Sequence, residues 1–335
     1  MSMSARFDIR SVMPYIGLLV LLPLMLVIVA TCEPSLSKNY VPCRRRIFPL
    51  IPLIVLTTAI VLLLLLEELR MGAQIIALCN QKGGVGKSTT AFQLARAGVQ
   101  QGQRVLLVDN DPQGNLTFVS AQTPVFEDQA GLADALSSRT DVTLKDVIIP
   151  GVWSGLDLVP TTGVTLGYVR DELVIAGAGR EQRLRQALST VTDRYDLVII
   201  DCAPSLDQLT INGLAAADAV VVVTHSKLFS ANGLSQLLGT IEDVRQYYNP
   251  ELAIAGIIIN QHEDRTLSGQ TWLEELQDAA TARDLPLLSP PIPKRVVISD
   301  ATEAARGLDE WGSAEATKLS AIYTDHLASI QGVKP

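Results

Sequence analysis

The sequence predicts an α/β fold in which helices cover both faces of a mostly parallel β-sheet. Short apolar runs alternate with helical patterns along residues 71–335. Runs such as 197–200 and 220–223 are apolar at every position, which is typical of strands buried on both faces. A glycine-rich segment stands between the first of these runs and the first helical pattern. This alternation predicts one large parallel domain.

Six strands and six helices are predicted along this region. The strands are expected at 74–79, 104–109, 156–159, 196–201, 219–224 and 253–259. The helices are expected at 88–100, 181–192, 207–216, 231–247, 268–282 and 313–330. Ligands of such sheets bind in the loops after the carboxyl ends of the strands, so we expect the chemistry there.

The turn after the first predicted strand reads Lys-Gly-Gly-Val-Gly-Lys-Ser at 82–88. Glycines let backbone N–H groups point at phosphate oxygens, and the helix N-terminus adds partial positive charge. In a P-loop, Lys87 reaches the β- and γ-phosphates and the Ser88 hydroxyl ligates Mg²⁺. The usual first glycine is Gln81 in this chain, and a second lysine, Lys82, follows it. The motif predicts a P-loop NTPase fold with one additional cation near the phosphates.

Two further predicted strands end in carboxylates. Asp109 ends one of them, and Asp111 follows within an Asp-Pro-Gln-Gly turn. Their side chains point the same way from extended backbone, because they lie two residues apart. Asp201 ends a buried strand of the Walker B form, where an unpaired carboxylate is costly unless it serves a cation. Together with the glycine loop, these acids predict a Mg²⁺-dependent ATPase.

Residues 1–70 differ from the remainder. The segments 12–31 and 47–66 hold no charged residue, and each has about the length of a transmembrane helix. Two spans would leave the basic loop at 38–46 outside, against the preference of positive charge for the inside. The other interpretation is that translation begins at Met71 and that residues 1–70 are not translated. The sequence leaves both open.

The charge and the cysteine content indicate neither a strongly basic nucleic-acid-binding protein nor a metal site built from cysteines. The net charge is −8, and residues 1–70 hold seven basic and four acidic residues, which leaves 20 basic and 31 acidic residues for the rest. Without a basic excess, any DNA contact must come from a local patch. No Cys-x-x-Cys pair or Cys/His cluster indicates a metal site.

These motifs resemble the ParA/MinD family of deviant Walker ATPases, most closely the partition ATPases called ParA or Soj. The main matching stretches are 80–90, 108–115 and 196–205, and shorter ones lie at 214–218, 233–238 and 292–296. The resemblance covers nearly all of 71–335 and none of 1–70.

The resemblance implies an ATPase that forms a homodimer on binding ATP and Mg²⁺. It implies that Lys82 reaches into the partner's site, that Lys87 holds phosphate, and that Asp111 orients the attacking water. The implied metal residues are Ser88, Asp109 and Asp201. The implied nucleotide-binding residues are Gly83, Gly84, Val85, Gly86, Lys87, Ser88, Thr89, Asn260 and Pro293, the last two near the adenine.

The resemblance also implies partners and a place in the cell. It implies non-specific binding of nucleoid DNA, for which Arg245, Lys294 and Arg295 are candidates, and a ParB-like partner that stimulates hydrolysis. Such a protein serves chromosome or plasmid segregation in the cytoplasm at the nucleoid. The alternative is a MinD-like positioning or signalling ATPase, tethered to the inner membrane if residues 1–70 are translated.

Overall fold

The computed structural model describes residues 72–225, 231–264 and 266–333. The chain divides into two compact units, Met1–Met71 and Gly72–Pro335, and all described residues belong to the second.

Three features expected near the N-terminus lie outside the described residues. They are the candidate spans at 12–31 and 47–66 and the candidate start at Met71. Across the described ranges, no helix combines the length and the apolar character that crossing a bilayer requires.

Eight strands form one sheet in the order β3-β4-β2-β5-β1-β6-β7-β8. All neighbouring strands run parallel except β3 and β4, which are antiparallel. The strands are β1 (Gln74–Cys79), β2 (Val105–Asn110), β3 (Ile149–Pro150), β4 (Leu156–Val159), β5 (Leu197–Cys202), β6 (Ala219–His225), β7 (Ala253–Asn260) and β8 (Leu287–Leu288). Every residue of β2, β5 and β6 is buried, as expected for parallel strands covered on both faces.

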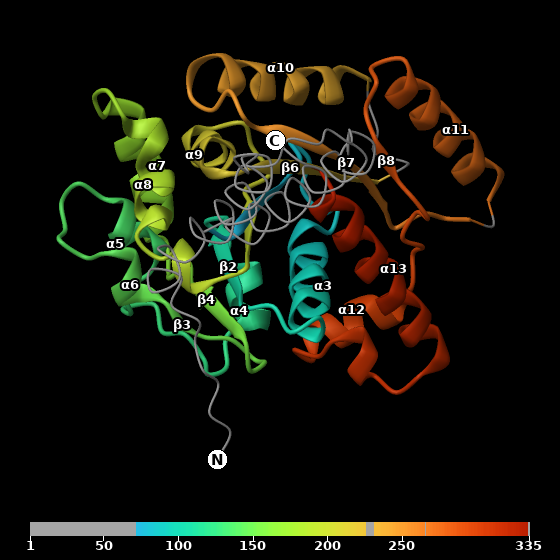
Figure 1. Cartoon of the computed structure of the whole chain (residues 1–335), viewed down its shortest axis with the longest axis horizontal. Coiled ribbons are helices and arrows are strands. Elements are labelled where there is room, and N and C mark those ends of the chain that lie inside the picture. Colours follow the sequence, from blue (N-terminus) through green and yellow to red (C-terminus); the bar gives the residue numbers. More distant parts are fainter. Residues whose placement is uncertain (1–71, 226–230, 265, 334–335) are drawn as a thin grey trace, which may run out of the picture. The chain divides into compact units, whose positions relative to one another are not determined.

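Helices pack on both faces of the sheet (Figure 1). They are α3 (Lys87–Gln100), α4 (Asn115–Ser120), α5 (Leu132–Leu136), α6 (Leu144–Val147), α7 (Thr165–Ile175), α8 (Arg183–Ser189), α9 (Gln208–Ala216), α10 (Ala231–Tyr247), α11 (Leu267–Thr281), α12 (Val296–Glu303) and α13 (Ala314–Gln331). Strand residues alternate between two hydrophobic clusters, so that Val198 and Ile200 belong to one and Leu197 and Ile199 to the other. Helices α5 to α11 complete the first cluster, and α3, α4, α12 and α13 complete the second.

The predicted parallel α/β fold is confirmed, and all six predicted strands lie within one residue of their expected bounds. The prediction of one helix at 181–192 is wrong. The helix α8 ends at Ser189, and short 3₁₀ turns flank it at Arg180–Gln182 and Thr192–Arg194. Three β-branched residues in a row at 190–192 disfavour continuation of the helix.

Seven elements, most of them short, were not predicted. They are β3, β8, α4, α5, α6, α7 and α12. Two-residue strands and helices of four to six residues, such as α4, α5 and α6, are too short to show a clear period in the sequence.

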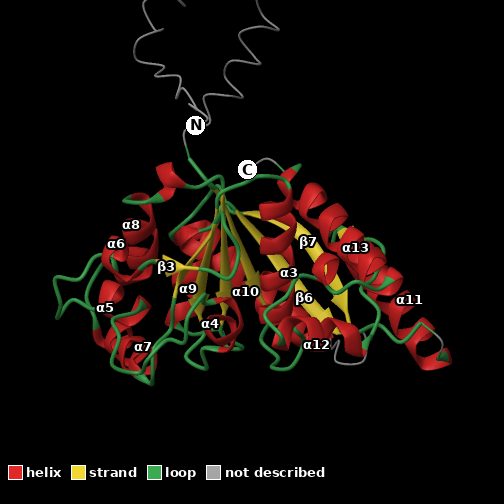
Figure 2. Ribbon diagram, turned by 90° about the horizontal axis from the view of Figure 1, so that it is seen from below, coloured by secondary structure: helices red, strands yellow, loops and turns green. Residues whose placement is uncertain are grey.

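The sheet brings the predicted site residues to one edge. Asp109 at the end of β2 and Asp201 near the end of β5 are register partners, and Asp201 also pairs with Leu78 near the end of β1. Figure 2 shows the helices on both sides of the strands. The loops after β1, β2 and β5 therefore start from the same edge of the sheet, where ligands of parallel sheets bind.

Candidate functional site

The glycine loop connects the end of β1 to the start of α3. Gly84 and Gly86 adopt left-handed backbone conformations, with φ of 73° and 82°. Gly86 is the N-cap of α3, so Lys87 and Ser88 form its first turn. The fully buried Val85 anchors the loop between these glycines. The first N–H groups of a helix have no partner within the helix, so this turn presents donors suited to phosphate oxygens.

The end of β7 holds the glycine loop in place. The side-chain amide of Asn260 donates to the carbonyl oxygen of Val85 at 2.9 Å, and that of Gln261 donates to the carbonyl of Gly84 at 3.1 Å. A Cβ atom on Gly86 would displace the Asn260 amide, and the positive φ at this position would strain any other residue, so glycine is favoured there. The Asn260 side-chain oxygen accepts from the backbone N–H of Gln261. Contact of Asn260 and Pro293 with adenine remains a prediction.

A second asparagine, Asn80, fixes the entry to the loop. Its side-chain amide donates to the carbonyl of Val223 on β6 at 2.7 Å, and its oxygen accepts from the backbone N–H of Lys82 at 3.0 Å. The half-buried Lys82 thus lies on backbone that is tied to the sheet. Sequence reasoning missed this contact, because nothing in the sequence pairs residue 80 with β6.

The carboxylate of Asp201 is buried without a well-formed hydrogen bond within the described chain. The residue is 0% exposed, and neither side-chain oxygen accepts a well-formed hydrogen bond from a described residue, although the Ser88 hydroxyl lies near enough to favour the charged form. Burial, followed by the charge of Asp109, raises the pKa of Asp201 to about 8, although Lys87 and the nearby Ser88 hydroxyl act in the opposite direction. Two unpartnered buried oxygens beside a serine hydroxyl fit a hard cation such as Mg²⁺, which prefers oxygen ligands and retains water.

Asp109 is equally buried, but its oxygens already accept hydrogen bonds. One oxygen accepts from the Thr117 N–H at 2.7 Å and from the Thr117 hydroxyl at 2.6 Å. The other accepts from the backbone N–H of Asp111 at 3.3 Å. Burial raises the pKa of Asp109 to about 6, and the bonds from Thr117 partly oppose this shift. Asp109 therefore ties the start of α4 to the Asp111 turn, and contact with a metal remains a prediction.

Asp111 forms the turn that follows β2. Its side chain is buried, and Oδ1 accepts from the backbone N–H of Gln113 at 3.0 Å, which closes an Asx turn. Gly114, with a φ of 67°, then begins α4. The structure thus brings Asp111 close to Asp109, and through the β2–β5 register close to Asp201.

The three predicted DNA contacts lie elsewhere and face acidic groups. Lys294 contacts Glu263 at 3.3 Å, and Arg295 contacts Glu315 at 3.1 Å. Arg245 lies on α10, where its Nε donates to the carbonyl of Leu252 and its guanidinium lies 3.8 Å from the carboxylate of Glu242. Lys294 and Arg295 are neighbours in the sequence, whereas Arg245 lies on a separate helix, α10.

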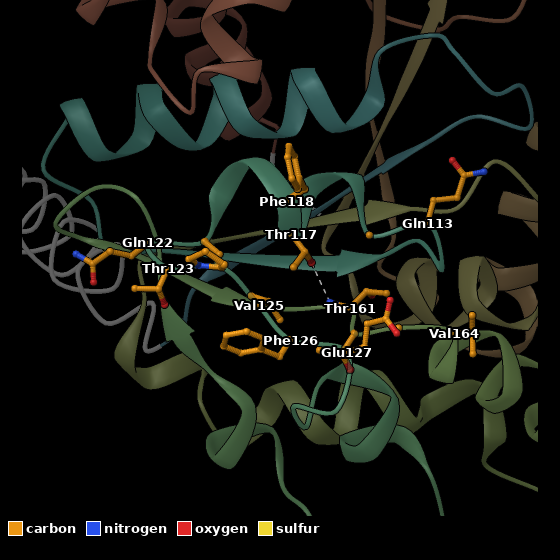
Figure 3. A pocket seen from close by; sticks show the side chains of 15 residues that line it. Gln113, Thr117, Phe118, Gln122, Thr123, Val125, Phe126, Glu127, Thr161 and Val164 are labelled. Carbon is orange, nitrogen blue, oxygen red and sulfur yellow. Dashed lines mark hydrogen bonds between the residues drawn. The ribbon is translucent and has the colours of Figure 1, made fainter.

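A cavity of about 670 Å³ opens beside the Asp111 turn (Figure 3). It lies among α4, the segment that follows it and the loop before α7. Its lining residues are Gln113, Gly114, Thr117, Phe118, Ala121, Gln122, Thr123, Pro124, Val125, Phe126, Glu127, Thr161, Thr162, Gly163 and Val164. Glu127 is the only charged residue among them, and no pattern in the sequence indicates this cavity.

Known proteins are similar to this chain in sequence and in fold. The family model AAA_31, described as an AAA domain, matches residues 73–254. An uncharacterized protein of Mycobacterium tuberculosis is 43% identical over 198 residues, which are 59% of this chain and 61% of that protein. The chromosome-partitioning ATPase Soj of Thermus thermophilus is 40% identical over 205 residues, which are 60% of this chain and 75% of Soj.

A solved structure also resembles the described unit. It is named cobyrinic acid a,c-diamide synthase of Mycobacterium smegmatis and contains an ATP analog and magnesium. It is 35% identical, has a TM-score of 0.61, and covers 72% of this chain and 96% of its own. The chain spans only about 61% of the length of the M. tuberculosis relative that it matches. The match to the family model and the similarity to Soj show that the chain belongs to the AAA_31 family of AAA domains and, within it, to the ParA/MinD family of P-loop proteins close to ParA and Soj.

Proposed function

We propose that this protein is a Mg²⁺-dependent ATPase of the ParA/Soj type that dimerises on binding ATP. The observation that carries the proposal is the buried, unpartnered carboxylate of Asp201 beside Ser88 and Lys87. A charge in such a place is costly without a cation. The name of the Thermus relative, a chromosome-partitioning ATPase, supports the cellular part of the proposal.

The residues of the site have different roles in phosphoryl transfer. The first turn of α3 and Lys87 bind the phosphates, and Ser88 and Asp201 hold the metal ion. When bound, Mg²⁺ neutralises charge on the phosphate oxygens. Asp111 orients the attacking water, and Asp109 holds the turn that carries Asp111. Catalysis of this kind consists of positioning and electrostatic stabilisation.

Lys82 supplies the second cation from the partner subunit. Each subunit would thus complete the other's site, and hydrolysis would require the dimer. A cation brought to the γ-phosphate in trans raises phosphoryl-transfer rates by about 10³–10⁵-fold in other enzymes.

We further propose that the ATP-bound dimer binds nucleoid DNA through Arg245, Lys294 and Arg295 and is stimulated by a ParB-like protein. The acidic neighbours of Lys294 and Arg295 reduce the positive electrostatic potential that these two residues offer to phosphates. We expect the DNA affinity to fall steeply as the salt concentration rises. In a plot of log affinity against log salt concentration, the slope should be about −0.9 for each phosphate neutralised.

A second candidate is an ATP-dependent amide synthase, because the M. smegmatis structure carries such a name. The cavity beside Asp111 argues against a carboxylic acid substrate at that place. Its one charged lining residue is Glu127, which would repel another carboxylate.

Turnover of ATP by the full chain tests the proposal. We expect phosphate release that requires Mg²⁺, together with a dimer in sedimentation experiments with a slowly hydrolysed ATP analogue but not with ADP. DNA should raise the turnover, and cobyrinic acid with an ammonia source should not. Turnover that needs cobyrinic acid would select the synthase, and no turnover under any condition would exclude both.

A further inference from the structure

The segment that leads into the glycine loop is bonded to two other elements. The side-chain amide of Asn80 donates to the carbonyl oxygen of Val223 on β6 at 2.7 Å. The Nε2 of the next residue, Gln81, donates to the Oε1 of Gln236 on α10 at 2.8 Å. Because α3 and α10 cover opposite faces of the sheet, the second bond joins the entry to α3 with a helix on the other face (Figure 1).

The helix α10 gives Gln236 a fixed position. Leu234 and Leu237 on the same helix are 7% and 1% exposed, and both belong to the first hydrophobic cluster. Gln236 itself is exposed, so its side chain extends from a helix that the core holds in place. Groups carried by helices and strands keep their positions more precisely than groups on loops. Gln236 therefore offers an acceptor whose position depends on the core and not on the glycine loop.

The additional lysine of the loop, Lys82, directly follows a departure from the usual P-loop pattern. That pattern has glycine where this chain has Gln81, and glycine has no side chain that could bond to α10. The backbone N–H of Lys82 donates to the side-chain oxygen of Asn80 at 3.0 Å. The backbone from which Lys82 extends is thus joined to β6 through Asn80 and to α10 through Gln81.

We propose that Gln236 is a positioning residue, which through Gln81 directs Lys82 towards the ATP site of the partner subunit. Loss of the Gln81–Gln236 bond leaves the roles of Lys87 and Ser88 in their own subunit intact, but it loosens the backbone that carries Lys82. A group misplaced by about 1 Å can cost about 10²-fold in rate. One exposed hydrogen bond restrains the backbone only in part, so we expect a smaller loss, of about three- to tenfold. The inference rests on the proposed action of Lys82 across the dimer.

ATP turnover by variants of the full chain is the first test. Gln236→Ala should lower kcat by about three- to tenfold and change KM by less than about twofold, because nucleotide binding in the same subunit persists. Gln236→Glu keeps an oxygen that can accept from the Gln81 amide, so it should retain most of the turnover. Gln331→Ala is the matched control, because Gln331 Oε1 accepts from the Gln103 amide at 3.4 Å in another glutamine pair. This control should turn over ATP as the wild type does.

Mixed dimers distinguish the positioning of Lys82 from a structural role within one subunit. One subunit carries Asp111→Asn and supplies Lys82, whereas its partner carries Lys82→Ala and hydrolyses ATP. Adding Gln236→Ala to the subunit that supplies Lys82 should slow turnover by about three- to tenfold. Adding it instead to the subunit that hydrolyses ATP should leave the rate within about twofold of that of the parent mixed dimer. Both dimers lose the same hydrogen bond, so only its place relative to the active site differs.

Three results would overturn the role of Gln236 while leaving the proposed function in place. They are an unchanged kcat in Gln236→Ala, a loss in Gln236→Glu as large as that in Gln236→Ala, and equal losses in the two mixed dimers. A parent mixed dimer that hydrolyses no ATP, although the wild type does, would contradict the action of Lys82 across the dimer and with it the role of Gln236. A wild-type chain that never hydrolyses ATP would contradict the proposed function itself.

Discussion

The side-chain amide of Asn260 donates a hydrogen bond to the carbonyl oxygen of Val85 at 2.9 Å. This bond joins the end of β7 to the middle of the glycine loop, and Gln261 adds a bond to Gly84. Contacts within the chain therefore hold the loop in this shape. A preformed loop lowers the cost of ordering on binding.

Replacing Asn260 should weaken both the fold and the binding of ATP. Asn260→Ala leaves the buried carbonyl of Val85 without its partner, which costs about 1–3 kcal/mol of unfolding free energy. Asn249→Ala is a matched control, because the Asn249 amide also donates to a backbone carbonyl, that of Ala217 at 2.7 Å. We expect similar losses of stability in urea but reduced ATP affinity only for Asn260→Ala. Equal ATP affinity in the two variants would contradict the account of the loop.

Replacing each of two glycines that have a positive φ distinguishes the effect of backbone strain from that of steric crowding. Gly86 and Gly102 have φ of 82° and 79°, but only at Gly86 would a Cβ atom meet another side chain. Each change to alanine should cost about 1 kcal/mol or more in stability. We expect Gly86→Ala also to lose ATP binding in calorimetry, and Gly102→Ala to keep it. Loss of binding in both variants would show that global stability, and not the loop, is responsible.

Asp111 should be needed for hydrolysis and not for binding. Asp111→Asn keeps an oxygen that can accept from the Gln113 N–H, so the turn persists while the charge is lost. We expect turnover to fall by about 100-fold or more, and an ATP-bound dimer to accumulate. Asp128→Asn serves as the control for loss of a nearby exposed carboxylate. An unchanged rate in Asp111→Asn would remove this residue from the mechanism.

A buried histidine should make the stability depend on pH. His326 is 0% exposed, and neither of its ring nitrogens makes a well-formed hydrogen bond with a described residue, although the Pro290 carbonyl lies nearby. Burial lowers the pKa of His326 below 6.5, while the Pro290 carbonyl and Asp325 act less strongly in the opposite direction. The unfolded chain then binds a proton more readily than the folded one.

The unfolding free energy should therefore fall as the pH drops below 6.5, and the fall should stop below the lowered folded pKa. The contribution of this one group is at most about 1.4 kcal/mol per pH unit. His326→Leu should flatten the profile in that window, as urea unfolding at several pH values would reveal. Parallel profiles for the two proteins would exclude His326 as the source.

The sequence predicts the parts of the site that depend on local pattern. The glycine loop, its helix and the carboxylates of Asp109 and Asp201 all follow from a strand and the residues directly after it. The Asn260–Val85 bond, the Asp109–Thr117 bonds and the cavity near Phe118 did not follow. They join segments whose contact depends on tertiary packing and leaves no period in the sequence. The spacing of apolar residues over 181–192 predicts one continuous helix. The three β-branched residues at 190–192, which disfavour its continuation, were given too little weight.

Mixing two inactive variants tests most directly whether each subunit completes the other's site. Lys82→Ala and Asp111→Asn should each hydrolyse ATP slowly when measured alone. In a mixed dimer, the subunit that keeps Asp111 receives Lys82 from its partner, so one of the two sites is complete. We expect an equal mixture to recover about a quarter of the wild-type rate, because random pairing in a two-fold dimer makes half of the dimers mixed. A mixture as inactive as its components, although the two variants form dimers with each other, would contradict the action of Lys82 across the dimer.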